Sequence, residues 1–228
     1  MGTFISIEGL DGSGKTSVIN LVAQQLKSDG LDIVCTKEPG GSTIANKVRD
    51  ILKDKENKNM DYITETLLYA ACRSQHLHDF IIPNLNEDKI VISDRFVDSS
   101  YVYQGIARNL GLDQVMAINS LVVKDHMPDL TIFIDIAPEK CLARLKKAKR
   151  NGAQVDLESL DFHNRVREGY LIIQKLFKDR IVKINGDQPL EKLAKEVYEA
   201  IDVFLRGRSN EGIFSRTPTS SVRHFIKL

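Results

Sequence analysis

The chain has 228 residues, of which 42% are hydrophobic and 28% are charged. These proportions are typical of a folded globular protein, and the length suits one domain with an appendage. Lys and Arg total 32 and Asp and Glu total 31, which leaves a formal net charge of +1. A charge so close to zero gives no reason to expect nucleic acid or an anionic membrane as a partner.

The sequence lacks the features of exported and membrane proteins. No apolar run approaches the roughly 20 residues that a membrane-spanning helix needs. The N-terminus has neither the basic segment nor the apolar segment of a secretion signal. Cys35, Cys72 and Cys141 are odd in number and widely spaced, which favours reduced thiols. We therefore expect a cytoplasmic protein.

Short β-branched runs alternate along the chain with stretches in which apolar residues recur at helical spacing. The runs expected to form buried strands are residues 4–7, 33–35, 90–92, 131–134 and 181–184. The stretches with helical periodicity are residues 18–26, 44–51, 63–71, 115–122, 160–173 and 193–201. This alternation predicts an α/β fold, in which a five-stranded parallel sheet is flanked by helices.

The first predicted strand leads into a phosphate-binding motif, GxxxxGK[ST]. Its residues are Gly9, Leu10, Asp11, Gly12, Ser13, Gly14, Lys15 and Thr16, with Ser17 directly after them. Glycines let backbone N–H groups turn toward an anion at the start of a helix. Lys15 can bring a positive charge to the β- and γ-phosphates, and the Thr16 hydroxyl can bind Mg²⁺. A glycine-rich turn with a solvated lysine is the alternative, but the position between strand and helix favours a nucleoside triphosphate with Mg²⁺.

The third predicted strand ends in Asp94 and Arg95, at the sheet edge where ligands bind in open α/β folds. Asp94 can help to hold Mg²⁺, and Arg95 can bind a phosphate through two N–H groups. An ion pair on the surface is the alternative. A GTPase is disfavoured, because the segment 46–49 lacks the final Asp of the guanine-reading motif.

Four segments carry a more specific resemblance. They are residues 4–16, 36–42, 67–76 and 94–105, and the match extends from about residue 3 to residue 204. In these segments the chain resembles the thymidylate kinase family. The resemblance implies the P-loop fold of nucleoside monophosphate kinases, with transfer of the γ-phosphoryl group of ATP to dTMP. ATP and dTMP are then the substrates, Mg²⁺ is the cofactor, and a homodimer is the expected assembly.

The resemblance also implies which residues bind the acceptor. They are Asp11, Glu38, Pro39, Arg49, Tyr69, Arg73, Arg95, Ser99, Ser100, Tyr103 and Gln104. Tyr69 would stack on thymine, although core packing explains an aromatic residue at this spacing equally well. Arg73 would donate a hydrogen bond to the base, and Tyr103 would crowd the position of a ribose 2′-hydroxyl.

The catalytic residues that the resemblance implies lie around the phosphates. Lys15, Arg95 and Asp11 belong to this group, and Asn185 would lie in a loop against the adenine. Asp11 would contact the 3′-hydroxyl of the acceptor sugar, and Arg95 would hold the acceptor phosphate. The basic segment 144–154 occupies the place of the family's lid, at about residues 144–155.

The lid is expected to supply one catalytic arginine. Gly12 stands where some family members carry a P-loop arginine, so the chain follows the bacterial type, in which the lid provides it. We expect Arg150 to act, ahead of Arg144, because Gln154 replaces the lid arginine that the family often has. A solvated helix end is the alternative for this segment.

The predicted kinase domain comprises residues 1–205, and residues 206–228 form an extension that we expect to be poorly ordered. Two other functions stay open. One is a different P-loop nucleoside or nucleotide kinase, accepting dUMP or a deoxynucleoside. The other is an ATP-binding switch without catalysis, which would have no need of a second substrate pocket.

Overall fold

The computed structural model describes residues 2–150 and 158–211. Within these ranges, five parallel strands form one sheet in the order β2-β3-β1-β4-β5. The strands are β1 (Thr3–Gly9), β2 (Ile33–Lys37), β3 (Ile90–Asp94), β4 (Leu130–Asp135) and β5 (Ile181–Asn185). Each contains one of the runs predicted as a buried strand, so the predicted α/β fold is confirmed.

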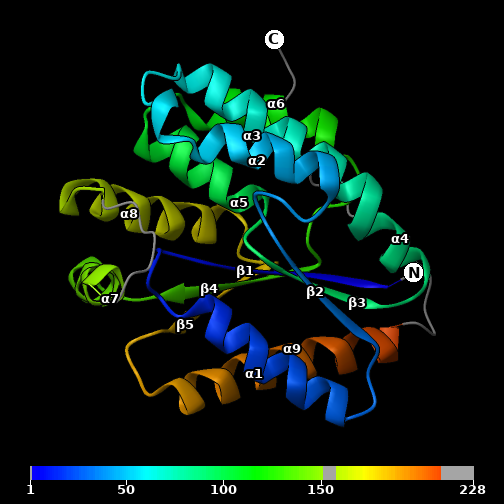
Figure 1. The fold of residues 1–228 in the computed structure, drawn as a ribbon. Helices are drawn as coiled ribbons and strands as arrows, with labels where there is room; N and C mark the ends of the chain where they lie inside the picture. The colour runs from blue at the N-terminus through cyan, green and yellow to red at the C-terminus, as the bar shows by residue number, and fades with distance from the viewer. Residues whose placement is uncertain (1, 151–157, 212–228) are drawn as a thin grey trace.

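Helices cover both faces of the sheet (Figure 1). On one face, α1 (Lys15–Ser28) and α9 (Leu190–Glu211) pack against each other. The helices of the other face are α2 (Thr43–Lys53), α3 (Tyr62–His76), α4 (Ile82–Asn86), α5 (Val97–Ser100), α6 (Leu112–Val123) and α8 (Leu160–Leu176), with α7 (Pro138–Arg150) beside α8. The described residues also form a short 3₁₀ helix, η1 (Lys55–Asn57), and two π-helices, η2 (Leu77–Ile81) and η3 (Tyr101–Ala107). Among the described helices, none combines the length and the apolar character needed to cross a bilayer.

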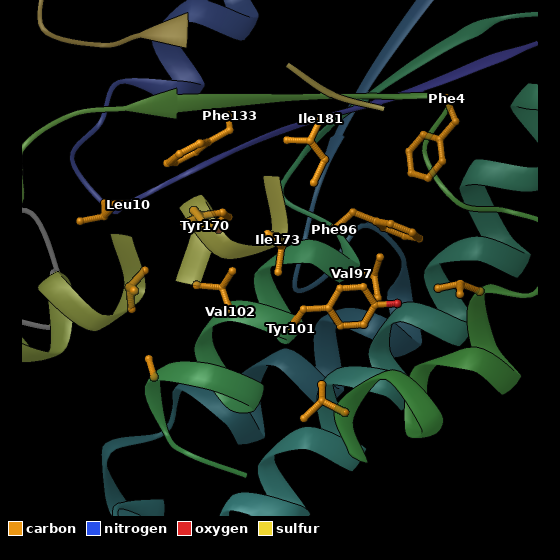
Figure 2. Packing of buried hydrophobic residues seen from close by; sticks show 14 of the residues in the cluster. Phe4, Leu10, Phe96, Val97, Tyr101, Val102, Phe133, Tyr170, Ile173 and Ile181 are labelled. Carbon is orange, nitrogen blue, oxygen red and sulfur yellow. The ribbon is translucent and has the colours of Figure 1, made fainter. Parts of the chain in front are cut away.

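Each face of the sheet has its own apolar core, because side chains alternate between the two faces along a strand. In β1, Ile5 belongs to the core shared with α1 and α9, whereas Phe4 belongs to the core on the opposite face. Figure 2 shows this second core, in which the rings of Phe4 and Phe96 meet edge to face, 4.8 Å apart. The ring of Tyr170 stacks on Phe133, also at 4.8 Å between centroids, so α8 is tied to the face of β4 that carries this core.

The carboxyl ends of all five strands meet at one edge of the sheet, since the strands are parallel. The P-loop follows β1, the loop of residues 38–42 follows β2, and residues 95–96 follow β3. The chain leaves β1 toward α1 on one face and leaves β3 toward α5 on the other. Such a reversal opens a crevice at the carboxyl edge of a parallel sheet. The predicted motifs therefore converge on the same crevice.

The last helix extends beyond the predicted domain boundary at residue 205. α9 continues to Glu211, so residues 206–211 belong to the helix and not to a poorly ordered extension. Arg206 pairs with Asp202 one turn earlier, and Arg208 reaches Asp129 at 2.8 Å. Arg208 thus anchors the end of α9 to the segment that precedes β4. Residues 212–228 of the predicted extension, and 151–155 of the predicted lid, lie outside the described residues.

Candidate active site

The P-loop wraps tightly against α7, and this contact explains its Gly12. Gly12 has a φ of 83°, in the left-handed region that favours glycine. A Cβ atom at this position would lie 2.7 Å from the carbonyl oxygen of Cys141 and 3.1 Å from Cγ of Leu145. No side chain fits there without moving α7. The structure therefore leaves no place for an arginine at residue 12.

Lys15 is the first residue of α1, and its ammonium group lies inside the loop. It is 6% exposed, and its Nζ donates hydrogen bonds to the carbonyl oxygens of Gly9 at 3.1 Å and Leu10 at 2.9 Å. Burial, with the nearby positive charge of Arg95, lowers the pKa of Lys15 to about 8. An anion bound in the loop would stabilise the charged form. The ammonium is thus placed for phosphate.

Thr16 and Asp94 come together at the same edge. The Thr16 hydroxyl donates to Oδ2 of Asp94 at 2.6 Å, although the two residues belong to different elements, α1 and β3. The pairing of β1 with β3 places Ile7 opposite Asp94, which sets this carboxylate beside the P-loop. A hydroxyl and a carboxylate side by side are hard oxygen donors of the kind that Mg²⁺ accepts.

Arg95 is held by four hydrogen bonds that use every N–H group of its two terminal nitrogens. Nη1 donates to the Ser99 hydroxyl at 2.8 Å and to the Tyr170 hydroxyl at 3.1 Å. Nη2 donates to Oδ1 of Asp11 at 2.8 Å and to the Tyr103 hydroxyl at 3.1 Å. The Arg95 guanidinium keeps the pKa of Asp11 well below its usual range. Arg95 itself has a φ of 71°, so its backbone is also constrained.

A cavity of about 460 Å³ opens beside this cluster. Its lining includes every residue predicted for the acceptor site except Arg49: Asp11, Glu38, Pro39, Tyr69, Arg73, Arg95, Ser99, Ser100, Tyr103 and Gln104. Arg49 lies outside, over the loop that follows β2, where a Cβ on Gly40 would be 3.4 Å from its Cδ. Arg49 is thus absent from the lining of the cavity, and its contact with the acceptor stays a prediction.

Arg73 lies at the inner end of the cavity and is 2% exposed. Its Nε donates to Oε2 of Glu38 at 2.9 Å, and its Nη1 donates to Oδ1 of Asn119. Its Nη2 donates to the carbonyl oxygen of Phe96 at 3.3 Å and to the Ser100 hydroxyl at 3.1 Å. These contacts join the loop after β2 with α3, α5 and α6. They leave the guanidinium in one orientation.

Apart from Gln104, the outer wall of the cavity is made by residues that the sequence did not single out. The Gln104 amide donates to Oε1 of Glu65 at 2.7 Å, and Nε of Arg108 donates to the same oxygen at 3.2 Å. The Arg108 guanidinium lies over the rings of Tyr62 at 5.0 Å and Phe162 at 5.2 Å. These residues come from α3, from η3 and the residue after it, and from α8. Their proximity therefore depends on how the helices pack and could not be predicted from the sequence.

The remaining residues predicted for the donor side belong to α7 and β5. Nη1 of Arg144 approaches the carbonyl oxygens of Gly12 at 3.3 Å and Ser13 at 3.5 Å, so this arginine rests on the P-loop. Arg150 is the last residue of α7, and its side chain lies outside the described part of the structure. Asn185 ends β5, where its Oδ1 accepts a hydrogen bond from the backbone of Asp187 at 3.0 Å.

Glu8 is a buried carboxylate at the end of β1 that the sequence analysis did not assign to the site. It is 0% exposed, yet it contacts Ser99 and Tyr170, which also hold Arg95. Burial, with the negative charge of Asp98, raises the pKa of Glu8 to about 7. A signal was present, because an acid at the end of an otherwise apolar strand is unusual.

The raised pKa of Glu8 predicts how the stability of the folded chain depends on pH. Ionisation of Glu8 is harder in the folded chain than in the unfolded chain, where its pKa is near 4.5. The stability that Glu8 contributes is therefore complete below pH 4.5 and is lost as the pH rises through about 7. From pH 5 to 8, we expect the unfolding free energy of the wild type to fall relative to Glu8→Gln, by at most about 3 kcal/mol. Denaturant titrations at each pH measure this difference, and a constant difference would contradict it.

Comparison with known proteins agrees with this geometry. A family model described as thymidylate kinase matches residues 7–197. A protein named thymidylate kinase from Clostridium novyi is 47% identical over 197 residues, which cover 86% of this chain and 96% of that protein. Another of the same name from Bacillus cytotoxicus is 48% identical over 202 residues, covering 88% and 97%.

A solved structure has the same architecture. The crystal structure of thymidylate kinase from Ehrlichia chaffeensis superposes with a TM-score of 0.72 at 31% identity, covering 88% of this chain and 98% of that one. The residues matched by the family model, 7–197, include the P-loop and the residues that line the cavity. The chain therefore belongs to the thymidylate kinase family of ATP-dependent phosphotransferases.

Proposed function

We propose that this chain transfers the γ-phosphoryl group of ATP to dTMP, with ADP and dTDP as products. The observation that carries the proposal is the cavity of about 460 Å³ beside the P-loop, with the Asp11–Arg95 pair between them. ATP would bind in the P-loop and dTMP in the cavity. The donor and acceptor phosphates would then meet at Arg95, where the acceptor phosphate would replace Asp11 or Tyr103 as an acceptor from Nη2.

The cavity suits a pyrimidine deoxynucleotide. Tyr69 and Arg73 would contact the base, and Arg95 would bind the acceptor phosphate at the opposite end. The ring of Tyr103 is held in place by the Arg95 guanidinium, which lies 5.0 Å from its centroid. A ring fixed in this way would leave little space for a ribose 2′-hydroxyl. Asp11 would accept a hydrogen bond from the 3′-hydroxyl.

Phosphoryl transfer requires little covalent chemistry from the protein itself. An ionised acceptor phosphate attacks the γ-phosphorus in line, so no general base is required. Negative charge accumulates on the transferring group and must be matched by fixed positive groups. Lys15 would serve the β- and γ-phosphates, Arg95 the acceptor phosphate, and an arginine of the lid the transferring group.

Mg²⁺ fits the residues present. The Thr16 hydroxyl and the Asp94 carboxylate, 2.6 Å apart beside the loop, would hold the ion together with phosphate oxygens. When bound, Mg²⁺ would neutralise charge on the triphosphate. The hydrogen bond between Thr16 and Asp94 also orients the two side chains relative to each other.

An ADP-release assay with a panel of acceptors tests the proposal. We expect the highest kcat/KM with dTMP, a lower value with dUMP and none with thymidine. A preference for dUMP or for a nucleoside would favour another kinase of the same fold. ATP binding without ADP release for any acceptor would favour a nucleotide-dependent switch.

Arg73→Ala should weaken dTMP binding far more than ATP binding. The change removes a charged hydrogen-bond donor at the inner end of the cavity, which corresponds to about 1.5–3 kcal/mol, or roughly a 10–150-fold rise in KM for dTMP. It also removes the arginine partner of the buried Glu38 carboxylate, which keeps only His76, so the melting temperature should fall. Steady-state kinetics with both substrates checks the first effect. An unchanged KM for dTMP would reduce Arg73 to a structural role.

A homodimer is supported by an exposed apolar surface on α2, α3 and α6, which pack together on one side of the molecule (Figure 1). Its residues are Ile44, Ile51, Ile63, Leu67 and Leu121, with exposed fractions from 47% to 75%. Ile44 and Ile51 are seven apart and Ile63 and Leu67 are four apart, so each pair shares a helix face. We propose that a second copy of the chain covers this surface.

Leu67→Asp should disrupt that dimer. A two-fold interface carries the substitution twice, and each buried leucine contributes about 1.5–3 kcal/mol. The dissociation constant should therefore rise at least about 100-fold, which sedimentation equilibrium measures. Leu176→Asp on α8 is the matched control, since Leu176 is also exposed, at 59%, but lies on another helix. Equal dimer content in both variants would exclude this surface.

A further inference from the structure

Glu8 makes three hydrogen bonds, and all three lead to Arg95. Its Oε1 accepts from the backbone N–H of Phe96 at 2.7 Å, which fixes the peptide directly after Arg95. Its Oε2 accepts from the Ser99 hydroxyl at 2.7 Å and from the Tyr170 hydroxyl at 2.8 Å. The same two hydroxyls accept from Nη1 of Arg95. One carboxylate therefore reaches both the backbone and the guanidinium of Arg95.

The direction of each hydroxyl proton follows from these contacts. Ser99 and Tyr170 each have one proton, and both oxygens face a carboxylate on one side and an Arg95 N–H on the other. A guanidinium only donates. The two hydroxyls also lie 3.0 Å from each other, but the Glu8 carboxylate is the stronger acceptor for both protons, and donation to it leaves lone pairs for Arg95. The carboxylate form of Glu8 is the form that sets this polarity.

We propose that Glu8 is a positioning residue for the phosphate-binding arginine: its ionised carboxylate orients the Ser99 and Tyr170 hydroxyls so that they hold the Arg95 guanidinium toward the acceptor phosphate. The inference rests on the proposed role of Arg95 in binding that phosphate. It adds a residue that does not reach the cavity itself, since Glu8 does not line it.

Protonation of Glu8 would reverse the polarity. A proton on Oε2 would be donated to one of the two hydroxyls, whose own proton would then turn away from Glu8, toward the other hydroxyl at 3.0 Å or toward Arg95, and the hold on Nη1 would weaken. The charged groups that act on Glu8 are Asp98 on α5, which disfavours ionisation, and Arg95, which favours it. Glu8 in turn acts on Lys15 of α1 and on Arg180 before β5. With its pKa near 7, Glu8 changes charge within the physiological range.

Glu8→Gln is the direct test, because an amide cannot accept at both ends. If its oxygen accepts from Phe96, its NH₂ group donates to Ser99 and Tyr170 and reverses them. At pH 8.5 we expect KM for dTMP to rise at least tenfold while KM for ATP changes less than twofold. Equal changes in both KM values would indicate a general structural defect and overturn the proposal.

Tyr170→Phe provides a second, independent test if Glu8→Gln does not fold. It removes the hydroxyl that bridges Glu8 and Arg95 and keeps the ring stacked on Phe133. We expect a selective rise in KM for dTMP, smaller than for Glu8→Gln because Ser99 still bridges. Tyr101→Phe is the matched control, since Tyr101 is buried in the same core at 4% exposure. Equal KM values for dTMP in the two variants would overturn the proposal.

The pH profile separates positioning from packing. The acceptor phosphate has its own second ionisation near pH 6, so the wild type must be compared with Glu8→Gln and not with itself. The KM for dTMP of Glu8→Gln, divided by that of the wild type, should fall from at least about 10 at pH 8.5 toward 1 at pH 6. At pH 6, Glu8 of the wild type is mostly protonated. A ratio that stays constant across this range would contradict a role for the carboxylate charge.

A double-mutant cycle with Arg95→Lys distinguishes the proposed phosphate-binding role of Arg95 from the proposed positioning role of Glu8. Lysine cannot use the paired acceptors on Ser99 and Tyr170 as a guanidinium does. We expect Arg95→Lys alone to raise KM for dTMP and to cancel most of the further effect of Glu8→Gln. An unchanged KM in Arg95→Lys would refute the phosphate-binding role of Arg95. A full Glu8→Gln effect on top of an impaired Arg95→Lys would refute the Glu8 inference alone.

Discussion

Lys15→Ala should lower kcat by about 10³-fold and leave the chain folded. Lys15 is the one charged side chain of the P-loop that points to its carbonyl lining, with Nζ bonded to Gly9 and Leu10. Its ammonium is buried and has a lowered pKa, so the folded state gains little from it without a ligand. The melting temperature should therefore stay the same or rise. Only the complex with the triphosphate loses a positive charge.

The measurement is kcat at saturating ATP and dTMP, together with thermal unfolding without ligand. Lys27→Ala is the matched control, because Lys27 belongs to the same helix, α1, and is exposed. Full activity in Lys15→Ala would contradict the proposal that the P-loop binds the phosphates of ATP. Loss of activity together with loss of folding would show that the charge is structural.

The second large effect concerns the arginines of α7. Residue 12 cannot carry a side chain, since a Cβ there would lie 2.7 Å from the Cys141 carbonyl oxygen. The P-loop therefore has no guanidinium of its own, and one must come from elsewhere if the transferring phosphoryl group is to be fully neutralised. Arginines in this role contribute roughly 10³–10⁵ in rate. We expect Arg150→Ala to lower kcat at least about tenfold, because neighbouring cations replace it in part.

Arg144→Ala provides the comparison that decides which arginine acts. Arg144 already lies on the loop, with Nη1 3.3 Å from the Gly12 carbonyl oxygen, whereas Arg150 ends the same helix. Lys146→Ala controls for the loss of any charge on α7, since Lys146 is exposed. Loss of kcat in Arg144→Ala with wild-type kcat in Arg150→Ala would assign the role to Arg144. Wild-type kcat in both would refute an arginine from α7.

Glu8 connects activity with stability. The network that holds Arg95 requires the carboxylate, but burial makes that form unfavourable in the folded chain. Glu8→Gln is therefore expected to gain relative stability at high pH while it loses affinity for dTMP. Opposite changes in these two quantities are typical of a buried group kept for function. A variant that loses both would point to packing instead.

The sequence by itself determined the fold class and the chemistry at the phosphates. The strands β1, β3 and β4 could be predicted because a strand buried on both faces is a nearly continuous apolar run, as in residues 131–134 of β4. The P-loop could be predicted because its glycines and Lys15 are neighbours in the chain, so their spacing alone specifies the loop. The residues of the acceptor site came from the family resemblance of four short segments. All but Arg49 line the cavity.

Only the tertiary structure decided how these residues are held. Glu8 and Tyr170 are 162 positions apart, and no local pattern links them. They meet because Glu8 points to the same sheet face on which Tyr170 stacks against Phe133. The Asn119 that holds Arg73 comes from α6 for the same reason. Contacts between distant elements depend on how helices pack on the sheet, and neither hydrophobic periodicity nor motif spacing contains that information.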